Sequence, residues 1–180
     1  MTLLWILLLP MLGTLVPVLT AKWSRSACAL LTALPVVVAF LLLISQTQAV
    51  FAGESLRYSL AWVPLLGLDI ALRLDGLAYL FALLILGIGL LIILYARYYL
   101  SARDSMGRFY TFLMLFMTAM LGIVLSNNLL QLWVFWELTS ISSFMLISFW
   151  WHRADARLGA RMALTITGFG GLALLAGILL

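Results

Sequence analysis

One acidic residue, Glu137, lies inside a long apolar stretch and is the residue of this sequence best suited to proton chemistry. It is nine residues beyond Asn128, roughly 14 Å along a helix and close to the middle of a bilayer. A charged side chain at that depth costs about 2.5–3.5 kcal/mol on insertion scales, so such residues usually have a function. Burial favours a neutral carboxyl and a nearby cation favours an ionised one, so a carboxyl held between these effects can take up and release a proton.

A purely structural role for Glu137 is the alternative, in which the carboxyl is protonated or paired and fixes helix packing. No Lys or Arg is expected at the same depth, so a cationic partner is expected from outside these residues. Ser140, one helical turn further on, shares the face of Glu137 and either supports a chain of water molecules or serves close packing. Trp133 and Trp136 flank the position and are expected to pack.

The remaining polar residues point to no catalytic, cofactor-binding or metal site. A single cysteine, Cys28, excludes an internal disulfide, a CxxC pair and a cysteine-ligated iron–sulfur cluster, and a single histidine, His152, excludes bis-histidine haem ligation by this chain alone. His152 is expected at an interface, where it either passes protons or serves as a solvated anchor. Asp69, Asp75 and Asp104 are also expected at interfaces, in capping or topological roles.

The composition places the chain in the membrane class. Hydrophobic residues make up 66% of its 180 residues and charged residues only 9%, whereas soluble domains carry about a quarter charged residues. The net charge of +4 does not indicate nucleic-acid binding, because the basic residues lie in short links between apolar runs. Unpaired backbone groups are not tolerated in hydrocarbon, so each run is expected to be helical.

The predicted fold is an all-α polytopic bundle of about six transmembrane helices, in one membrane domain over residues 1–180. The first run has no basic residue before it, so a cleaved signal peptide is not expected. The predicted helices cover about 3–20, 27–44, 76–95, 109–125, 128–150 and 158–180.

Basic residues predict the orientation of this bundle. Three of the links between helices are basic, and with six crossings they share one side, which the positive-inside rule makes cytoplasmic. The N-terminus is therefore expected outside. The basic residues of these links are Lys22 and Arg25, then Arg97, Arg103 and Arg108, then Arg153, Arg157 and Arg161.

The segment 53–75 departs from the helical pattern. Apolar residues alternate with polar or small ones over 56–62 and again over 68–74, on both sides of a Pro/Gly link at 63–67. This pattern predicts a β-hairpin on the outer face, with an irregular loop as the alternative. Asp75 is then expected at or near the N-cap of the third helix.

The last helix still runs at Leu180, with no interfacial residue after Gly168. We therefore expect the sequence to be the amino-terminal part of a longer subunit. Gly87 and Gly89 in the third helix, and Gly168, Gly170 and Gly171 in the sixth, are expected to permit close helix approach.

The stretch around Glu137 resembles a known family. Residues 127–130 (NNLL) and 132–144 (LWVFWELTSISSF) look like the fifth helix of the antiporter-like subunits of respiratory complex I, membrane-bound hydrogenases and multisubunit Mrp antiporters. The form Phe-Trp-Glu-Leu-Thr-Ser most resembles the A-type subunit of the Mrp Na⁺/H⁺ antiporter. Residues 73–77 (RLDGL) and 95–99 (YARYY) fit as well.

This resemblance implies a subunit of a secondary cation/proton antiporter in a bacterial inner membrane. Its partners are then other membrane subunits of a hetero-oligomeric complex, with H⁺ and a monovalent cation such as Na⁺ as substrates. In that family the matching glutamate is implicated in proton movement through a pair with a lysine on a later helix. The alternatives are the proton-pumping subunit of complex I or of a hydrogenase, and a structural membrane scaffold.

Overall fold

The computed structural model describes residues 1–20, 23–63, 68–101 and 103–180. Within these residues, six helical spans are long and apolar enough to cross a membrane, which confirms the predicted bundle. Two spans are built from two consecutive helices, and the fifth ends in the short 3₁₀ helix η2 (Ser148–Trp150). The helices are α1 (Thr2–Gly13), α2 (Leu15–Thr20), α3 (Arg25–Ile44), α4 (Thr47–Phe51), α5 (Gly76–Tyr99), α6 (Met106–Leu125), α7 (Leu129–Ile147) and α8 (Ala154–Leu179).

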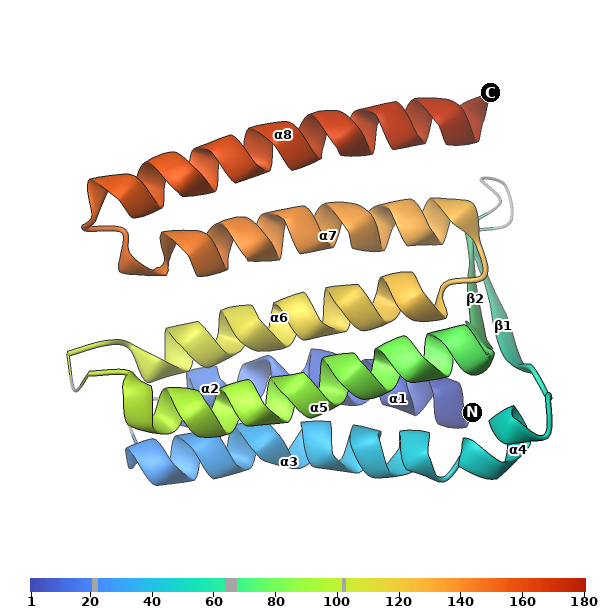
Figure 1. The fold of residues 1–180 in the computed structure, drawn as a ribbon, viewed down its shortest axis with the longest axis horizontal. Helices are drawn as coiled ribbons and strands as arrows, with labels where there is room; N and C mark the ends of the chain where they lie inside the picture. Colours follow the sequence, from blue (N-terminus) through green and yellow to red (C-terminus); the bar gives the residue numbers. More distant parts are fainter. Residues whose placement is uncertain (21–22, 64–67, 102) are drawn as a thin grey trace.

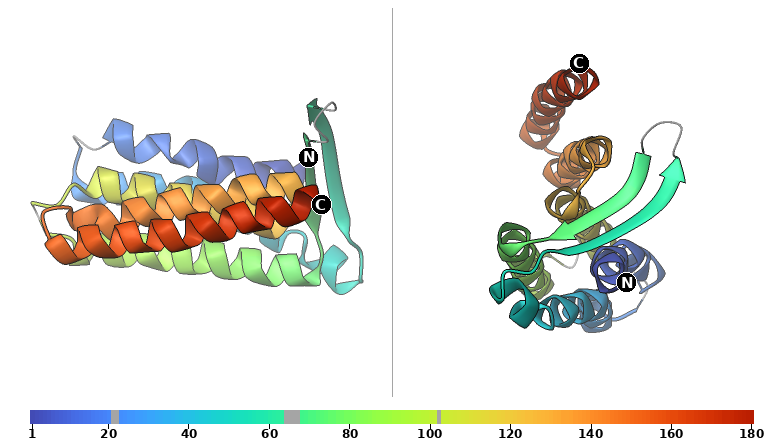
Figure 2. Two further views of the ribbon diagram at one scale, coloured as in Figure 1. Left: turned by 90° about the horizontal axis from the view of Figure 1, so that it is seen from above. Right: turned by 90° about the vertical axis from the view of Figure 1, so that its right-hand side faces the viewer.

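The spans run up and down in one bundle, with both termini at the same end (Figure 1). Helices α1, α3, α5 and α6 pack against one another, α7 packs on α6, and α8 packs on α7. Viewed along the helices, α8 is the outermost element (Figure 2). Most of its side chains are exposed, with Ala160 and Gly171 as its buried residues.

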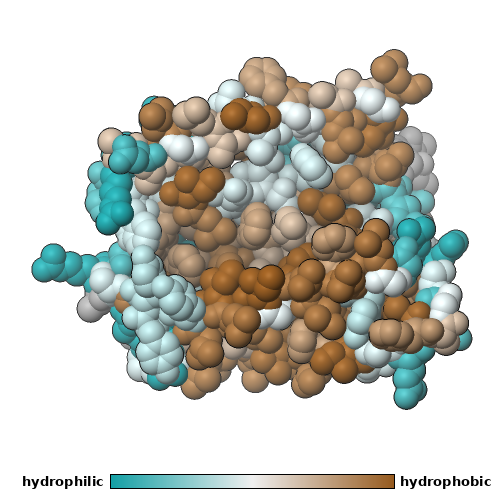
Figure 3. All heavy atoms as spheres, in the orientation of Figure 1, coloured by the Kyte–Doolittle hydropathy of each residue, from teal (hydrophilic) through white to brown (hydrophobic). Residues whose placement is uncertain are grey.

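The surface divides by polarity as a membrane protein requires. An apolar region covers the middle of the molecule, and hydrophilic residues gather at its two ends (Figure 3). A belt of exposed aromatic residues marks the end opposite the termini, where α5 carries Tyr95, Tyr98 and Tyr99 and the chain before α8 carries Trp151. Such belts lie at the headgroup level of a bilayer.

The predicted hairpin is present, as strands β1 (Leu56–Val63) and β2 (Leu68–Leu74). The strands are antiparallel, with Leu56 opposite Leu74 and Leu60 opposite Ile70. The alternating apolar residues therefore share one face, on which Leu72 and Leu74 are fully buried. The predicted link at 63–67 falls mainly on residues 64–67, which lie outside the described residues.

The hairpin lies across the bundle end that carries both termini (Figure 2). Strand β2 is fixed there by the connection between α6 and α7: Leu72 forms a β-bridge with Ser126, and the Asn127 amide donates to the Ala71 carbonyl at 2.8 Å. The Ala71 amide in turn donates to the Gln131 side-chain oxygen, also at 2.8 Å. The hairpin is thereby joined to the first turn of α7.

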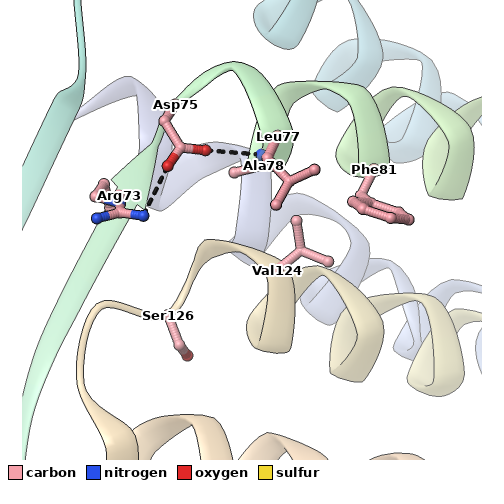
Figure 4. Close-up of a pocket in the computed structure, with 7 residues that line it drawn as sticks. All are labelled: Arg73, Asp75, Leu77, Ala78, Phe81, Val124 and Ser126. Carbon is pink, nitrogen blue, oxygen red and sulfur yellow. Dashed lines mark hydrogen bonds and ion pairs between the residues drawn. The ribbon is translucent and has the colours of Figure 1, made fainter.

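Asp75 ends the hairpin and caps α5, as predicted. Its Oδ1 accepts a hydrogen bond from the Ala78 amide at 2.9 Å, and its Oδ2 pairs with Arg73 at 2.7 Å (Figure 4). The Ala78 amide and the Arg73 guanidinium hold the pKa of this carboxyl below its usual 3.8. The ionised form therefore stabilises the start of the third span.

Candidate functional site

Helix α7 carries Glu137 to the middle of the bundle. The helix begins after Asn128, whose side-chain oxygen accepts the Gln131 amide at 3.0 Å, and runs to Ile147. Glu137 is eight residues beyond Leu129, so about 12 Å of helix separates it from that end. A helix of 19 residues is about 28 Å long, so Glu137 lies near its midpoint.

The carboxyl group of Glu137 lies directly against α8 at Gly171. A β-carbon placed on Gly171 would lie 2.8 Å from the Glu137 carboxyl carbon and still closer to Oε1. No side chain fits there, so the absence of one at Gly171 lets the carboxyl lie between α7 and α8. Of the predicted close-approach glycines in α8, Gly168 and Gly170 have no neighbour within 4 Å of such a β-carbon in the described structure.

Trp133 joins the same two helices one turn before Glu137. Its indole Nε1 donates to the Gly171 carbonyl at 2.9 Å. Gly171 thus contacts the acid and the indole at once, and α8 is held against the face of α7 that carries both. Trp136, which also flanks Glu137 in sequence, is 41% exposed.

Glu137 has an unsatisfied carboxyl oxygen. Oε1 is buried and has no hydrogen-bond partner among the described residues. Within the same residues, the only ion pair joins Arg73 to Asp75 at the hairpin end of the bundle. A cationic partner supplied from outside these residues therefore stays a prediction. A buried acceptor without a partner costs about 1–3 kcal/mol, so a donor from outside the described residues would stabilise this oxygen.

Ser140 is buried next to the site, but its hydroxyl is directed elsewhere. The Ser140 Oγ donates to the Trp136 carbonyl of its own helix at 3.3 Å. No hydrogen bond links Ser140 to Glu137 in the part of the chain that the structure describes. Its predicted support of a water chain stays a prediction.

His152 and Asp104 lie together at the end of the bundle opposite the hairpin. Asp104 accepts hydrogen bonds from the Ser101 hydroxyl at 2.8 Å and from the Trp150 indole at 2.9 Å. These two donors, together with the nearby His152, hold the pKa of Asp104 below its usual 3.8. Asp104 thus links the loop before α6 to the end of the fifth span. It does not cap α6, whose N-cap residue is Ser105 and has no side-chain capping hydrogen bond.

Sequence reasoning missed a second pair of polar residues, Asp69 and Gln131. Both line one cavity of about 390 Å³ between α1, α6 and α7. The Asp69 Oδ1 and the Gln131 Nε2 are buried and have no partner among the described residues. Asp69 was expected to be solvated at an interface; this residue of β2 is half-buried, and its Oδ1 is buried. The available signal was Gln131 itself, a polar residue within the apolar run of α7.

Two family models match the chain. Residues 62–110 match "NADH-Ubiquinone oxidoreductase (complex I), chain 5 N-terminus", and residues 126–180, which include both Glu137 and Gly171, match "NADH:quinone oxidoreductase/Mrp antiporter, TM". The chain belongs to the antiporter-like family of membrane subunits.

Two relatives illustrate this antiporter-like membership. The A/B-type subunit of a probable K(+)/H(+) antiporter from Rhizobium meliloti (strain 1021) is 48% identical over 174 residues, or 97% of this chain. The A1-type subunit of a Na(+)/H(+) antiporter from Staphylococcus aureus is 50% identical over 148 residues, or 82% of it. This antiporter-like chain spans only 17% and 18% of the length of these relatives.

Solved structures agree with this family membership. One chain of the "Structure of Mrp complex from Dietzia sp. DQ12-45-1b" is 30% identical, with a TM-score of 0.79 over 98% of this chain and 19% of that one. A chain of the archaeal membrane-bound sulfane sulfur reductase is 24% identical, with a TM-score of 0.82 over 99% of this chain and 27% of that one. The second likeness shows the fold alone.

Proposed function

We propose that this chain is the amino-terminal part of a cation/proton antiporter subunit in which Glu137 carries the transported proton. The observation that supports this most directly is the buried, unpartnered Oε1 of Glu137 at the midpoint of α7. An ionisable group so placed in a membrane helix is a functional-site hypothesis by default. The names of the two relatives, which describe subunits of a K(+)/H(+) and of a Na(+)/H(+) antiporter, support exchange of H⁺ for a monovalent cation.

The contact with α8 gives the carboxyl two distinct environments. While Glu137 lies against Gly171, its Oε1 is buried and receives no hydrogen bond from the described residues, so a charge on it is costly. If α8 moves away, or if a cationic side chain from beyond these residues approaches, a charge on the carboxyl becomes less costly. Alternation between these environments takes up and releases one proton, and the Trp133–Gly171 hydrogen bond holds the first of them.

We propose the following partners, membrane and orientation for the chain. The chain acts as a transporter subunit without enzymatic chemistry, among other membrane subunits of a hetero-oligomeric complex in a bacterial cell membrane. The hairpin and both termini lie outside, and the opposite end lies in the cytoplasm. The arginines support this orientation, because the described ones at the end opposite the hairpin, such as Arg97, Arg103 and Arg153, outnumber Arg57 and Arg73 at the hairpin end.

The test compares the intact antiporter complex with its Glu137→Gln variant in everted vesicles from a host lacking its own antiporters. Gln keeps the shape of the side chain but carries no exchangeable acid. A pH gradient is formed, Na⁺ or K⁺ is added, and the dissipation of the gradient is followed at equal membrane levels of the two complexes. We expect the wild type to respond and the variant to lose at least nine-tenths of the response, on the order of a tenfold effect.

Equal responses of the two complexes contradict a proton-carrying role and leave Glu137 as a structural residue. If the wild type responds to neither cation, the antiporter assignment fails. A redox-driven proton pump then becomes the better assignment, which the complex I description of the matched family model supports.

A further inference from the structure

A second pocket lies at the end of the bundle opposite the hairpin, away from Glu137. It has a volume of about 510 Å³ and lies between the loop that precedes α6 and the turn that precedes α8. Three basic side chains line it, Arg103, His152 and Arg153, together with one acidic side chain, Asp104. The pocket is therefore predominantly positive.

The acidic residue of the pocket already accepts hydrogen bonds from neighbouring residues. Asp104 accepts the Ser101 amide and hydroxyl through one oxygen, at 2.9 and 2.8 Å, and the Trp150 indole through the other, at 2.9 Å. None of these donors comes from Arg103 or Arg153. The carboxylate thus lines the pocket without engaging either guanidinium group.

The arginines of this end fall into two groups. Four of them donate to carbonyl or hydroxyl oxygens within the protein. By contrast, no hydrogen bond or ion pair engages the guanidinium groups of Arg103, Arg153 and Arg161 among the described residues, and of these three Arg103 and Arg153 line the pocket. The four that donate are Arg25 to Leu100 and Ser101, Arg97 to Ser26, Arg108 to Phe149, and Arg157 to Trp151.

Aromatic side chains orient the Arg153 guanidinium and indicate how deep the pocket lies in the membrane. The Arg153 guanidinium lies over the Trp150 ring, 5.1 Å from its centroid, which restricts the side chain before any ligand arrives. Tyr99 lines the same pocket and stacks on Tyr95 at 5.1 Å. Tyr95 and Tyr99 belong to the aromatic belt, so the pocket lies at the level of the lipid headgroups.

We propose that this pocket binds a phosphate group, and that a membrane phospholipid with a net negative charge supplies it. Two free guanidinium forks and an imidazole match the oxygens of a phosphate, which arginine can bind in bidentate fashion. The aromatic rim accommodates the glycerol and upper acyl region of a lipid. Basic pockets between membrane helices bind anionic headgroups in this way. The site is independent of the proton chemistry at Glu137.

The experiment uses the intact complex that contains this chain, purified in detergent. Native mass spectrometry counts the lipids retained after addition of phosphatidylglycerol, of phosphatidylcholine, or of inorganic phosphate alone. The variants are Arg103→Gln with Arg153→Gln, and Arg161→Gln as the matched control. Arg161 is an exposed arginine of α8 that does not line the pocket.

We expect the wild type and Arg161→Gln to retain one more phosphatidylglycerol than the double variant. Its affinity for this lipid should fall about fivefold for each arginine removed. Phosphatidylcholine should show no such difference. If the double variant fails to assemble, Arg153→Lys keeps the charge without the planar fork and should give an intermediate loss.

Equal retention of phosphatidylglycerol by the wild type and the double variant overturns the proposal, as does an equal loss in Arg161→Gln. Inorganic phosphate is the third outcome. If it binds the wild type and competes with the lipid at equal concentration, the pocket binds a phosphate group, but the proposal that a lipid supplies this group is overturned.

Discussion

The carboxyl group of Glu137 lies against Gly171, a residue 34 positions later in the chain, and Gly171 is the position in α8 where a β-carbon would overlap it. The same glycine carbonyl accepts the Trp133 indole. Among the described residues, Gly171 and Trp133 therefore define the environment of the acid. Each of the two can be changed separately, with a neighbour of the same type as its control.

Gly171→Ala should displace the Glu137 carboxyl. A methyl group inserted into a closed space costs about 1–3 kcal/mol, and it forces either the acid or the whole of α8 to move. We expect a lower midpoint of thermal unfolding and at least a several-fold loss of cation-induced gradient dissipation. Gly170→Ala is the control, because a β-carbon there meets nothing within 4 Å in the described structure and alanine favours a helix by about 1 kcal/mol. Equal behaviour of the two variants would contradict the close contact.

Trp133→Phe should loosen α8 without emptying the space between the helices. The substitution removes the Nε1–H that donates to the Gly171 carbonyl and retains an aromatic ring. Hydrogen bonds between membrane helices contribute about 0.6–2 kcal/mol, so a loss of that size in the free energy of unfolding is expected. Trp136→Phe is the matched control, because the Trp136 side chain is 41% exposed. A positioning role for Trp133 also predicts a shifted pH profile of antiport, which lost stability alone does not produce.

The sequence predicted the six spans and the hairpin because local patterns determine them. Hydrocarbon forces each long apolar run into a helix, and alternation over 56–62 and 68–74 favours two strands over an irregular loop. The depth of Glu137 followed from counting along one helix. The contact between Glu137 and Gly171 could not be predicted from the sequence. Which of Gly168, Gly170 and Gly171 faces Glu137 depends on how α8 is rotated against α7. That rotation is set by side-chain packing between helices, which composition does not encode.

The role of Gln131 escaped prediction for a similar reason. A polar residue in the first turn of a membrane helix suggests contact with water or headgroups. The acceptor role of Gln131 depends instead on the Ala71 amide, 60 residues earlier in the chain. Only the three-dimensional arrangement of β2 across the helix ends brings these two groups together.

Gln131→Leu should release the hairpin from α7. The Ala71 amide then loses its acceptor, and an unsatisfied amide at a part-buried position costs about 1–3 kcal/mol. Hydrogen–deuterium exchange should become faster at Ala71, with little change in the middle of α5. Gln131→Glu retains an acceptor oxygen and should keep Ala71 more protected than the leucine variant does. Unchanged exchange at Ala71 in the leucine variant would show that other contacts of β2 suffice to hold the strand.

Asp75 should make the start of α5 sensitive to acid. Its pKa in the folded protein is lowered by the Ala78 amide and by Arg73, so its stabilising effect is fully present above the ordinary value of 3.8. The effect is lost as the pH falls through the lowered pKa, because folding then no longer favours the ionised form. Asp75→Asn keeps a capping oxygen but cannot ionise. The difference in unfolding midpoint between wild type and Asp75→Asn should therefore be greatest near pH 6 and shrink below pH 3.8, whereas a constant difference would exclude this linkage.

The attachment of β2 to the α6–α7 connection also orders the events of biosynthesis. Ala71 leaves the ribosome 60 residues before Gln131, which at 5–20 residues per second is an interval of about 3–12 seconds. Throughout that interval α5 and α6 are inserted while the edge of β2 still lacks its final partners. The hairpin can therefore be attached to α7 only after the start of the fifth span has been synthesised. A ribosome stalled before residue 131 would hold a bundle whose hairpin is not yet attached to α7.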